Sequence, residues 1–214
     1  FSSGFTMKPA KNANTMTGEA VNWMHQLAKE RNAAVMGSLV IAEGGKYFNR
    51  LFFVQPDETQ YTYDKRHLFT LAGEEKVYAR GNTRIVIDYE GWRIMPQVCY
   101  DLRFPVWCRN DLNYDLICFV ANWPERRSYP WRQLLRARAI ENQAYCIGVN
   151  RVGYDGNGIY HRGDSAAIDA LGEYISNIKP GEPGTEVVTL KKEHVVHTRS
   201  RFGFLKDRDE FEIK

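Results

Sequence analysis

The chain has 214 residues, of which 43% are hydrophobic and 26% are charged, so it is an ordinary globular sequence long enough for one sizeable core. Its net charge of +3 is too small to indicate a nucleic-acid or anionic-membrane partner. No apolar run approaches the roughly eighteen residues of a transmembrane helix, and no signal peptide is apparent.

The cysteine pattern indicates free thiols in a reducing compartment. The spacing of Cys99, Cys108, Cys118 and Cys146 contains no CxxC pair, which argues against a zinc centre or a redox dithiol. Cys118 and Cys146 lie in apolar, strand-like runs and are expected to be buried. We therefore predict a cytoplasmic protein without disulfides and without a metal site.

The first part of the chain is predicted to form a helix followed by three strands. Apolar residues recur at helical spacing over residues 17–31, with Thr17 as the predicted N-cap and Asn32 as the end of the helix. Residues 34–42 and 47–55 read as a hairpin, and residues 60–64 as a half-buried strand. Residues 65–83 form an irregular stretch, and a loop of that length in a compact domain is usually functional.

The second part alternates strands with helices. Strands are predicted at 84–89, 92–98, 114–121 and 145–150, with helices at 104–111 and 130–143. A glycine-rich loop (153–163), a hairpin (165–169 with 173–178), a last strand (185–190) and a terminal helix (191–201) follow. This alternation predicts a single α/β domain over residues 1–214.

Cys99 is the candidate nucleophile because it ends an apolar strand and begins a polar turn, in the stretch Met-Pro-Gln-Val-Cys-Tyr-Asp-Leu-Arg-Phe-Pro at 95–105. A turn at a strand end can expose a nucleophile in a fixed direction, and the N–H groups that follow can receive negative charge. Against this, a lone cysteine after a strand is more often a buried structural thiol. Spacing does not select its partner among the histidines, lysine, arginine and carboxylates at hand: His67, His161, Lys65, Arg103, Glu74, Glu75, Asp101 and Glu125.

Five short stretches, in order along nearly the whole chain, narrow the choice. They are Tyr-Asp-Lys-Arg-His-Leu-Phe (63–69), Gln-Val-Cys-Tyr-Asp-Leu-Arg-Phe-Pro (97–105), Ala-Asn-Trp-Pro (121–124), Leu-Arg-Ala-Arg-Ala-Ile-Glu-Asn-Gln (135–143) and Gly-Val-Asn-Arg-Val-Gly (148–153). With them the chain resembles the nitrilase (carbon–nitrogen hydrolase) superfamily, and specifically its ω-amidase branch.

The resemblance implies an αββα sandwich and a Glu–Lys–Cys triad. Cys99 matches the nucleophile, and Lys65 matches the lysine that holds the oxyanion together with the N–H after the cysteine, here that of Tyr100. Glu74 matches a second glutamate near the site, with Glu75 as the alternative if the register slips by one residue.

One element of the family pattern is not in the printed sequence. The triad's base glutamate normally precedes a stretch like Phe-Ser-Ser-Gly-Phe, which here occupies residues 1–5. The first strand and helix of such a domain would also lie upstream. We therefore expect the domain to be N-terminally incomplete, and the base is transferred to no other residue.

The branch hydrolyses short dicarboxylic monoamides such as α-ketoglutaramate, which implies a small amide substrate and a Cys thioester. Arg103 is the candidate for the distal carboxylate, and Asn122 and Trp123, at a strand end, are candidates for the pocket wall. The family implies no cofactor and a homodimer. A nitrilase, carbamoylase or aliphatic amidase, a non-catalytic metabolite-binding relative, and an unrelated Cys–His hydrolase remain alternatives.

Overall fold

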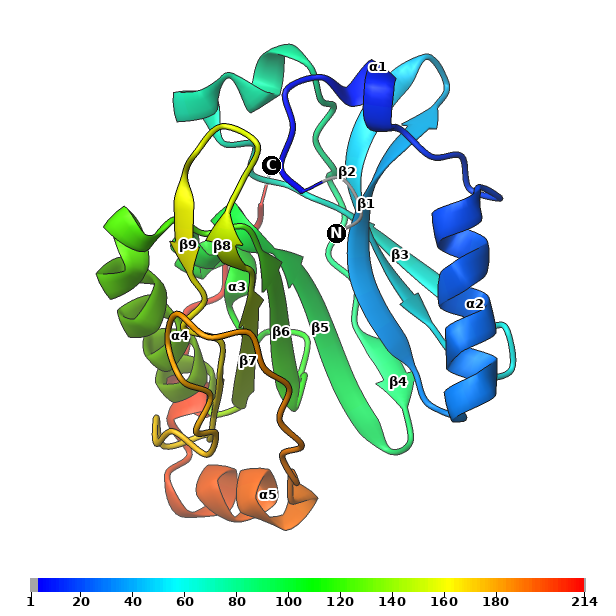
Figure 1. The fold of residues 1–214 in the computed structure, drawn as a ribbon. Coiled ribbons are helices and arrows are strands. Elements are labelled where there is room, and N and C mark those ends of the chain that lie inside the picture. The colour runs from blue at the N-terminus through cyan, green and yellow to red at the C-terminus, as the bar shows by residue number, and fades with distance from the viewer. Residues whose placement is uncertain (1–3, 214) are drawn as a thin grey trace. The chain divides into compact units, whose positions relative to one another are not determined.

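A computed structural model describes residues 4–213, and the chain divides into two compact units, residues 1–85 and 86–214 (Figure 1). Each unit contains a sheet with a helix packed against it, so the predicted α/β class is confirmed. The stretch at residues 1–5 resembles the segment that follows the base glutamate in the family. Its residues 1–3 lie outside the described residues.

The first unit is an antiparallel sheet covered by one long helix. A short helix α1 (Pro9–Asn12) precedes α2 (Glu19–Arg31). The sheet has the order β1 (Val35–Glu43), β2 (Lys46–Val54), β3 (Gln60–Asp64). The packed apolar residues come from one face of α2 and from the two longer strands: Val21, Met24, Ala28, Leu39, Ile41, Phe52 and Val54. The predicted helix and all three strands are confirmed, with boundaries within two residues.

The predicted N-cap of α2 is wrong. The helix begins at Glu19 with Gly18 as its N-cap, and no side chain caps it. A tight turn explains the difference: the Gly18 N–H bonds to the Thr15 carbonyl at 3.0 Å, and a Cβ on Gly18 would come within 3.1 Å of the Thr15 nitrogen. At the other end the helix stops at Asn32 as predicted, because Asn32 adopts the left-handed conformation with φ of 46°.

Residues 65–83 contain two short 3-10 helices, η1 (Thr70–Ala72) and η2 (Glu74–Lys76), and no longer regular element. The irregular character predicted for this segment is therefore confirmed. The strand predicted at 84–89 is shorter than expected and covers β4 (Ile87–Tyr89) alone.

The second unit has a five-stranded sheet with the order β10-β7-β6-β5-β4. Its centre is parallel and consists of β5 (Trp92–Val98), β6 (Leu116–Ala121) and β7 (Tyr145–Asn150). The two edge strands, β4 and β10 (Ala166–Ile168), run antiparallel to their neighbours. Every residue of β6 is buried, as expected of a central parallel strand, which explains its continuous apolar sequence.

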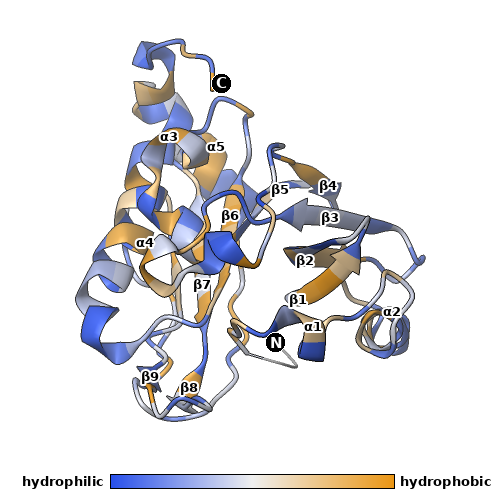
Figure 2. Cartoon of the chain, turned by 90° about the horizontal axis from the view of Figure 1, so that it is seen from above, coloured by the Kyte–Doolittle hydropathy of each residue, from blue (hydrophilic) through white to orange (hydrophobic). Residues whose placement is uncertain are grey.

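Helix α4 (Ser128–Asn142) packs against this sheet through one apolar side. Figure 2 shows that its remaining surface is mixed and partly hydrophilic. The contact with β7 is close, because a Cβ on Gly148 would lie 2.5 Å from a methyl group of Leu135. The shorter α3 (Pro105–Cys108) falls within the predicted helix 104–111. Among the helices in residues 4–213, none has the length and apolar character needed to cross a membrane.

The segment after β7 departs most from the predictions. The expected glycine-rich loop contains a hairpin of β8 (Val152–Tyr154) and β9 (Tyr160–Arg162). The predicted strand at 173–178 is reduced to an isolated bridge between Ile168 and Tyr174. The predicted strand at 185–190 does not form within the described residues; Val187 there is 97% exposed, so its apolar side chain has no sheet to pack on.

The predicted terminal helix is confirmed as α5 (Lys192–Arg201), followed by η5 (Phe204–Asp207). A buried carboxylate fixes it to the sheet: Asp115, at the start of β6, forms ion pairs with Lys192 and with Arg199. Arg199 also donates to the Tyr114 carbonyl at 2.6 Å. This basic helix is therefore held by specific contacts as well as by the apolar side chain of Val195.

Candidate active site

Cys99 occupies a strained position at the end of β5. It has φ of 46°, in the left-handed region that residues with a side chain seldom adopt, and it opens the 3-10 helix η3 (Cys99–Arg103). Such strain persists where the surrounding structure holds it, and it is concentrated at functional sites. The thiol is partly exposed, whereas Cys108, Cys118 and Cys146 are buried. Burial raises the pKa of the Cys118 thiol to about 12, and it raises the pKa of the other two buried thiols as well.

The carboxyl ends of β5 and β6 lie side by side, with Val98 opposite Val120 in the register. The Cys99 Sγ consequently lies 4.0 Å from the carbonyl oxygen of Asn122. The Asn122 Oδ1 atom is buried and has no hydrogen-bond partner among residues 4–213. The carboxyl ends of parallel strands are the usual place for a binding site in α/β sheets, and this end offers a thiol beside an unsatisfied acceptor.

Hydrogen bonds from two sides hold the Cys99 turn. Within the turn, the Val98 N–H donates to Asp101 Oδ2 at 3.2 Å. From α4, the Arg138 guanidinium donates to the Leu102 carbonyl through Nε at 3.1 Å and Nη2 at 2.8 Å. Arg138 is 3% exposed, and its Nη1 also donates to Glu141 Oε1 at 2.6 Å. The turn is thereby fixed to the helix that covers the sheet.

A second buried network supports the same helix end. The Asn142 amide accepts from the Asn110 N–H at 2.8 Å and donates to the Arg138 carbonyl at 2.9 Å. Asn110 in turn donates to the Tyr114 carbonyl at 2.9 Å. Asn142, within the Ala-Ile-Glu-Asn sequence, therefore joins α4 to the segment between η3 and β6.

Cationic side chains lie near the cysteine. The Arg103 guanidinium stacks over the Trp123 ring at 5.0 Å, and Trp123 is 4% exposed, with its indole N–H donating to the Arg127 carbonyl at 2.6 Å. Burial lowers the pKa of Arg127, as do its neighbours Arg126 and Arg103, while Cys99 and Tyr100 oppose this shift. The Arg127 guanidinium therefore lies within electrostatic range of the cysteine.

Arg127 did not emerge from the sequence alone. Its signal was weak: a pair of arginines, Arg126 and Arg127, follows Asn-Trp-Pro-Glu at the end of β6, and nothing in that spacing distinguishes them. The structure separates them, because Arg126 is exposed and Arg127 is partly buried.

The first unit contains the other predicted pair. Lys65 directly follows β3 and is 2% exposed, and Glu74 in η2 is fully buried. The Lys65 Nζ donates to Glu74 Oε2 at 2.6 Å, and the same oxygen accepts from the Phe69 N–H at 2.6 Å. Glu75 is exposed, so Glu74 is the residue that contacts the lysine. Burial and the Glu74 carboxylate together raise the pKa of Tyr78.

His161, one of the two histidines considered as a base, contacts a backbone carbonyl. The His161 ring, in β9, bonds through Nδ1 to the Ile159 carbonyl at 3.0 Å, and burial lowers its pKa. His67 lies two residues after Lys65 in the irregular segment of the first unit. Within residues 4–213 no group of three His, Cys, Asp or Glu side chains is placed to hold a metal ion.

The candidates thus form two groups, each defined within its own unit. Lys65 and Glu74 form a buried ion pair in the first unit. In the second, the thiol of Cys99 lies beside Asn122, and Trp123 stacks with Arg103.

Known proteins with similar sequences carry amidase names. The chain is 46% identical over 211 residues to omega-amidase YafV of Yersinia enterocolitica, covering 99% of this chain and 82% of that protein. It is 45% identical over 213 residues to omega-amidase YafV of Escherichia coli K12, covering 100% and 83%. A 2-oxoglutaramate amidase of Bacillus subtilis is 28% identical over 161 residues, covering 73% and 62%.

A solved structure shares the fold of this chain. A crystal structure of XC1258 from Xanthomonas campestris, a CN-hydrolase superfamily protein with an arsenic adduct in its active site, matches with a TM-score of 0.96. It is 43% identical, and the match covers 100% of this chain and 83% of that one. The predicted nitrilase-superfamily fold is therefore confirmed. The sequence model of the carbon-nitrogen hydrolase family matches residues 1–200, which include the first unit and most of the second. This chain belongs to the carbon–nitrogen hydrolase family.

Proposed function

We propose that the protein hydrolyses the terminal amide of a small ω-amido acid, such as α-ketoglutaramate or succinamate, to the acid and ammonia through a thioester on Cys99. The observation that carries the proposal is the position of Cys99. It is the partly exposed thiol of the four, at a left-handed residue at the carboxyl end of a parallel strand. The amidase names of relatives that match nearly the whole chain support the reaction class.

The chemistry proceeds in two halves. The Cys99 sulfur attacks the amide carbon, the thiol proton passes to the departing nitrogen, and ammonia leaves as the C–N bond breaks. Water then attacks the thioester carbon, the C–S bond breaks, and the acid and the free thiol are formed. In each half the carbonyl oxygen becomes an oxyanion, and we assign its stabilisation to the Tyr100 N–H. One such donor is worth about 3–4 kcal/mol in other acyl-transfer enzymes.

We assign the substrate's distal carboxylate to the cationic groups of the second unit. Arg103 is braced on the Trp123 ring, which fixes the direction of its guanidinium. Arg127 is partly buried and lies within electrostatic range of Cys99, where a guanidinium can pair with a substrate carboxylate. Asn122, beside the thiol, supplies an amide for the polar part of the substrate.

Lys65 and Glu74 are proposed as catalytic residues from the family pattern. Their mutual contact at 2.6 Å supports a role for Glu74 in orienting the lysine ammonium. The general base that takes the thiol proton is assigned to no residue of the printed sequence. We further propose that residues 1–214 belong to one hydrolase domain, and that the protein acts in the cytoplasm as a homodimer.

The test is release of ammonia by the full-length protein, produced from its complete reading frame. Succinamate and α-ketoglutaramate are supplied at neutral pH, with propionamide and propionitrile as comparison substrates. We expect turnover of the two amido acids, loss of turnover in Cys99→Ala, and near-normal turnover in Cys118→Ala, whose thiol is buried. Intact mass spectrometry should show an acyl adduct that Cys99→Ala abolishes. Hydrolysis of propionitrile in preference to both amido acids would contradict the proposal.

The carboxylate assignment has its own matched pair of variants. Arg127→Gln should raise KM for succinamate about tenfold or more, as expected when a charge-assisted hydrogen bond is lost, and should leave propionamide turnover nearly unchanged. Arg126→Gln, the exposed neighbour, should leave both substrates unaffected. Equal effects of Arg127→Gln on the two substrates would remove Arg127 from carboxylate recognition.

A further inference from the structure

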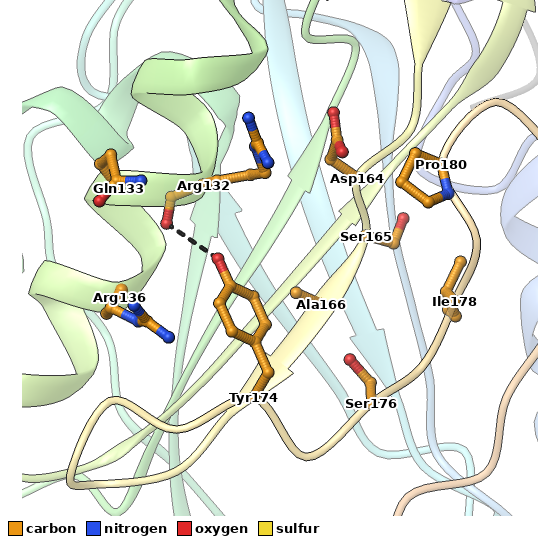
Figure 3. A pocket seen from close by; sticks show the side chains of 10 residues that line it. All are labelled: Arg132, Gln133, Arg136, Asp164, Ser165, Ala166, Tyr174, Ser176, Ile178 and Pro180. Atoms are coloured by element: carbon orange, nitrogen blue, oxygen red, sulfur yellow. Dashed lines mark hydrogen bonds between the residues drawn. The ribbon is translucent and has the colours of Figure 1, made fainter.

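A pocket of about 360 Å³ opens in the second unit between α4 and the segment around β10 (Figure 3). Three of its lining residues belong to α4, two directly precede β10, one begins β10 and four follow it. In that order they are Arg132, Gln133, Arg136, Asp164, Ser165, Ala166, Tyr174, Ser176, Ile178 and Pro180. None of these residues belongs to the set assigned to amide hydrolysis. The volume is in the range of small-molecule sites.

Asp164 is a buried carboxylate with one oxygen that accepts no hydrogen bond from residues 4–213. The residue is 6% exposed, and its Oδ2 atom is buried with no hydrogen-bond partner among residues 4–213. The nearest cation is Arg162, whose Nε lies 3.6 Å from Oδ1. Burial raises the pKa of this carboxyl, against the opposing influence of Arg162 and Arg132. Leaving the Oδ2 atom without a donor is costly, so an N–H group of a bound molecule would be favoured at this carboxylate.

Arg132 supplies the complementary charge. Its buried Nε atom has no hydrogen-bond partner in the described part of the chain, although its carbonyl accepts a bond from the Tyr174 hydroxyl at 3.4 Å. Figure 3 shows the Arg132 guanidinium and the Asp164 carboxylate at the same end of the pocket, with Ser176 at the opposite end. A donor-seeking carboxylate and an acceptor-seeking guanidinium therefore line one end together.

The remaining wall adds a second positive charge and fixes its position. The Arg136 guanidinium stacks over the Tyr174 ring at 4.8 Å, and its buried Nε also has no hydrogen-bond partner within residues 4–213. Arg132 and Arg136 against Asp164 give the lining a net charge of +1. A ligand with a net negative charge would balance it.

We propose that this pocket binds a small carboxylic acid that also carries an N–H donor, with its carboxylate on Arg132 and its N–H group on Asp164. Two sources have this chemistry: an α-amino acid, whose donor is an ammonium group, and an amido acid, whose donor is a terminal carboxamide. A purely apolar ligand would leave Asp164 Oδ2, Arg132 Nε and Arg136 Nε without hydrogen bonds from residues 4–213. A plain dicarboxylate would place an anion against Asp164.

Trp131 provides a local readout of binding. Its indole N–H donates to the Asp164 carbonyl oxygen at 2.8 Å, so its NMR signal should respond to a molecule that contacts Asp164. We would record ¹H–¹⁵N spectra of the full-length Cys99→Ala protein, in which no probe is consumed, and assign the signal from its loss in Trp131→Phe. Each probe would be titrated to saturation.

The probes separate the two required groups. Succinamate has a carboxylate and an amide, glutamate has carboxylates and an ammonium, succinate has no N–H donor, and propionamide has no carboxylate. We expect succinamate or glutamate to shift the Trp131 signal saturably, with succinate and propionamide about tenfold weaker or more. The tighter of the first two identifies the source. No saturable shift with any probe would overturn the proposal.

Two variants test the assigned contacts. Asp164→Asn keeps a side chain that tolerates the residue's left-handed φ of 54°, and it should reduce succinamate or glutamate affinity to that of succinate. Arg132→Gln, which breaks no side-chain hydrogen bond within the described part of the chain, should weaken the binding of every carboxylate about tenfold. The exposed controls Asp209→Asn and Arg201→Gln should change nothing. Unchanged binding in both Asp164→Asn and Arg132→Gln would place the ligand elsewhere and refute the site.

Discussion

The ion pair between Lys65 and Glu74 is the most deeply buried charge pair described in the chain, with side chains 2% and 0% exposed. Removing one partner leaves the other as an uncompensated buried charge, which costs about 3–5 kcal/mol. We therefore expect Glu74→Ala to lower the free energy of unfolding by that amount. Chemical denaturation monitored by circular dichroism would measure it.

Glu75 is the matched control for this substitution, because it is the next residue in η2 and is exposed. Glu75→Ala should change the unfolding free energy by about 0.5 kcal/mol or less, as surface substitutions usually do. Comparable losses of unfolding free energy in Glu74→Ala and Glu75→Ala would show that the buried Lys65–Glu74 pair does not contribute to stability as expected.

His161 is expected to make stability depend on pH. Its folded-state pKa lies below the ordinary value of 6.5, chiefly through burial and the nearby Arg151. Below about pH 6.5 the unfolded chain therefore binds a proton that the folded chain does not, and stability falls as pH falls. Thermal melts between pH 5 and 7.5 should show a smaller decline in His161→Asn than in the unaltered protein. Parallel declines in the two proteins would exclude His161 as the source.

Short motifs singled out candidate residues, and their roles stay predictions. The stretches around Lys65 and Cys99 pointed to both side chains, the family resemblance pointed to Glu74, and the structure places Glu74 in contact with Lys65. Arg127 was not predictable, since its distinction from Arg126 lies in burial and in the field of Cys99, which are tertiary properties. The Thr17 cap failed because a local turn ending at Gly18 sets the first turn of α2.

At the level of elements, α4 contacts the Cys99 turn through Arg138. Its two hydrogen bonds to the Leu102 carbonyl hold the turn that carries Cys99. We expect Arg138→Leu to reduce kcat about 10²-fold, the scale of loss that a displacement of about 1 Å gives, with KM changed much less. Arg138→Lys should recover part of kcat because it restores one donor.

The pH dependence of Cys99 alkylation by iodoacetamide distinguishes positioning from simple loss of stability. Arg138→Leu should shift that profile at a temperature where the variant remains folded, because the surroundings of the thiol change. Arg136→Gln, on the same helix, should not shift it, since Arg136 contacts the Tyr174 ring instead of the Cys99 turn. An unshifted profile with reduced kcat would contradict the positioning role of Arg138.

Elements with one strong pattern were predicted best. The continuous apolar sequence of β6 and the helical spacing of α2 each have one structural solution, and both formed within two residues of the predicted limits. The β8–β9 hairpin was missed because its glycines suggested a loop. The strand predicted at 185–190 failed because strand character also requires a neighbouring strand, which its sequence does not reveal.

Across the whole chain, protection should be greatest where strands have partners on both sides. β6 is fully buried and pairs with β5 and β7, whereas β10 has three residues at a sheet edge. We expect amides of β6 to exchange with solvent only on global unfolding, and those of β10 at least about tenfold faster. Native-state hydrogen exchange read by mass spectrometry tests this. Faster exchange in β6 than in β10 would contradict the order.

For the molecule as a whole, alternation of strands and helices predicted the α/β class, and the five ordered motifs predicted the family. The strand order of the sheet, the antiparallel edges and the pocket beside α4 were not predictable. These features depend on contacts between elements that are distant in the sequence. Such contacts leave no periodic pattern of apolar residues in the sequence.

The left-handed backbone conformation at Cys99 lowers the stability of the fold at the residue proposed to carry the activity. A side chain in that conformation costs about 1–2 kcal/mol, which glycine would not. Cys99→Gly would therefore relieve strain while removing the thiol that we propose as the nucleophile. Mutational drift toward a more robust fold would tend to replace the cysteine, and only selection for turnover would oppose it. A lineage that no longer needed the reaction should lose this residue early, while the sheet around it persisted.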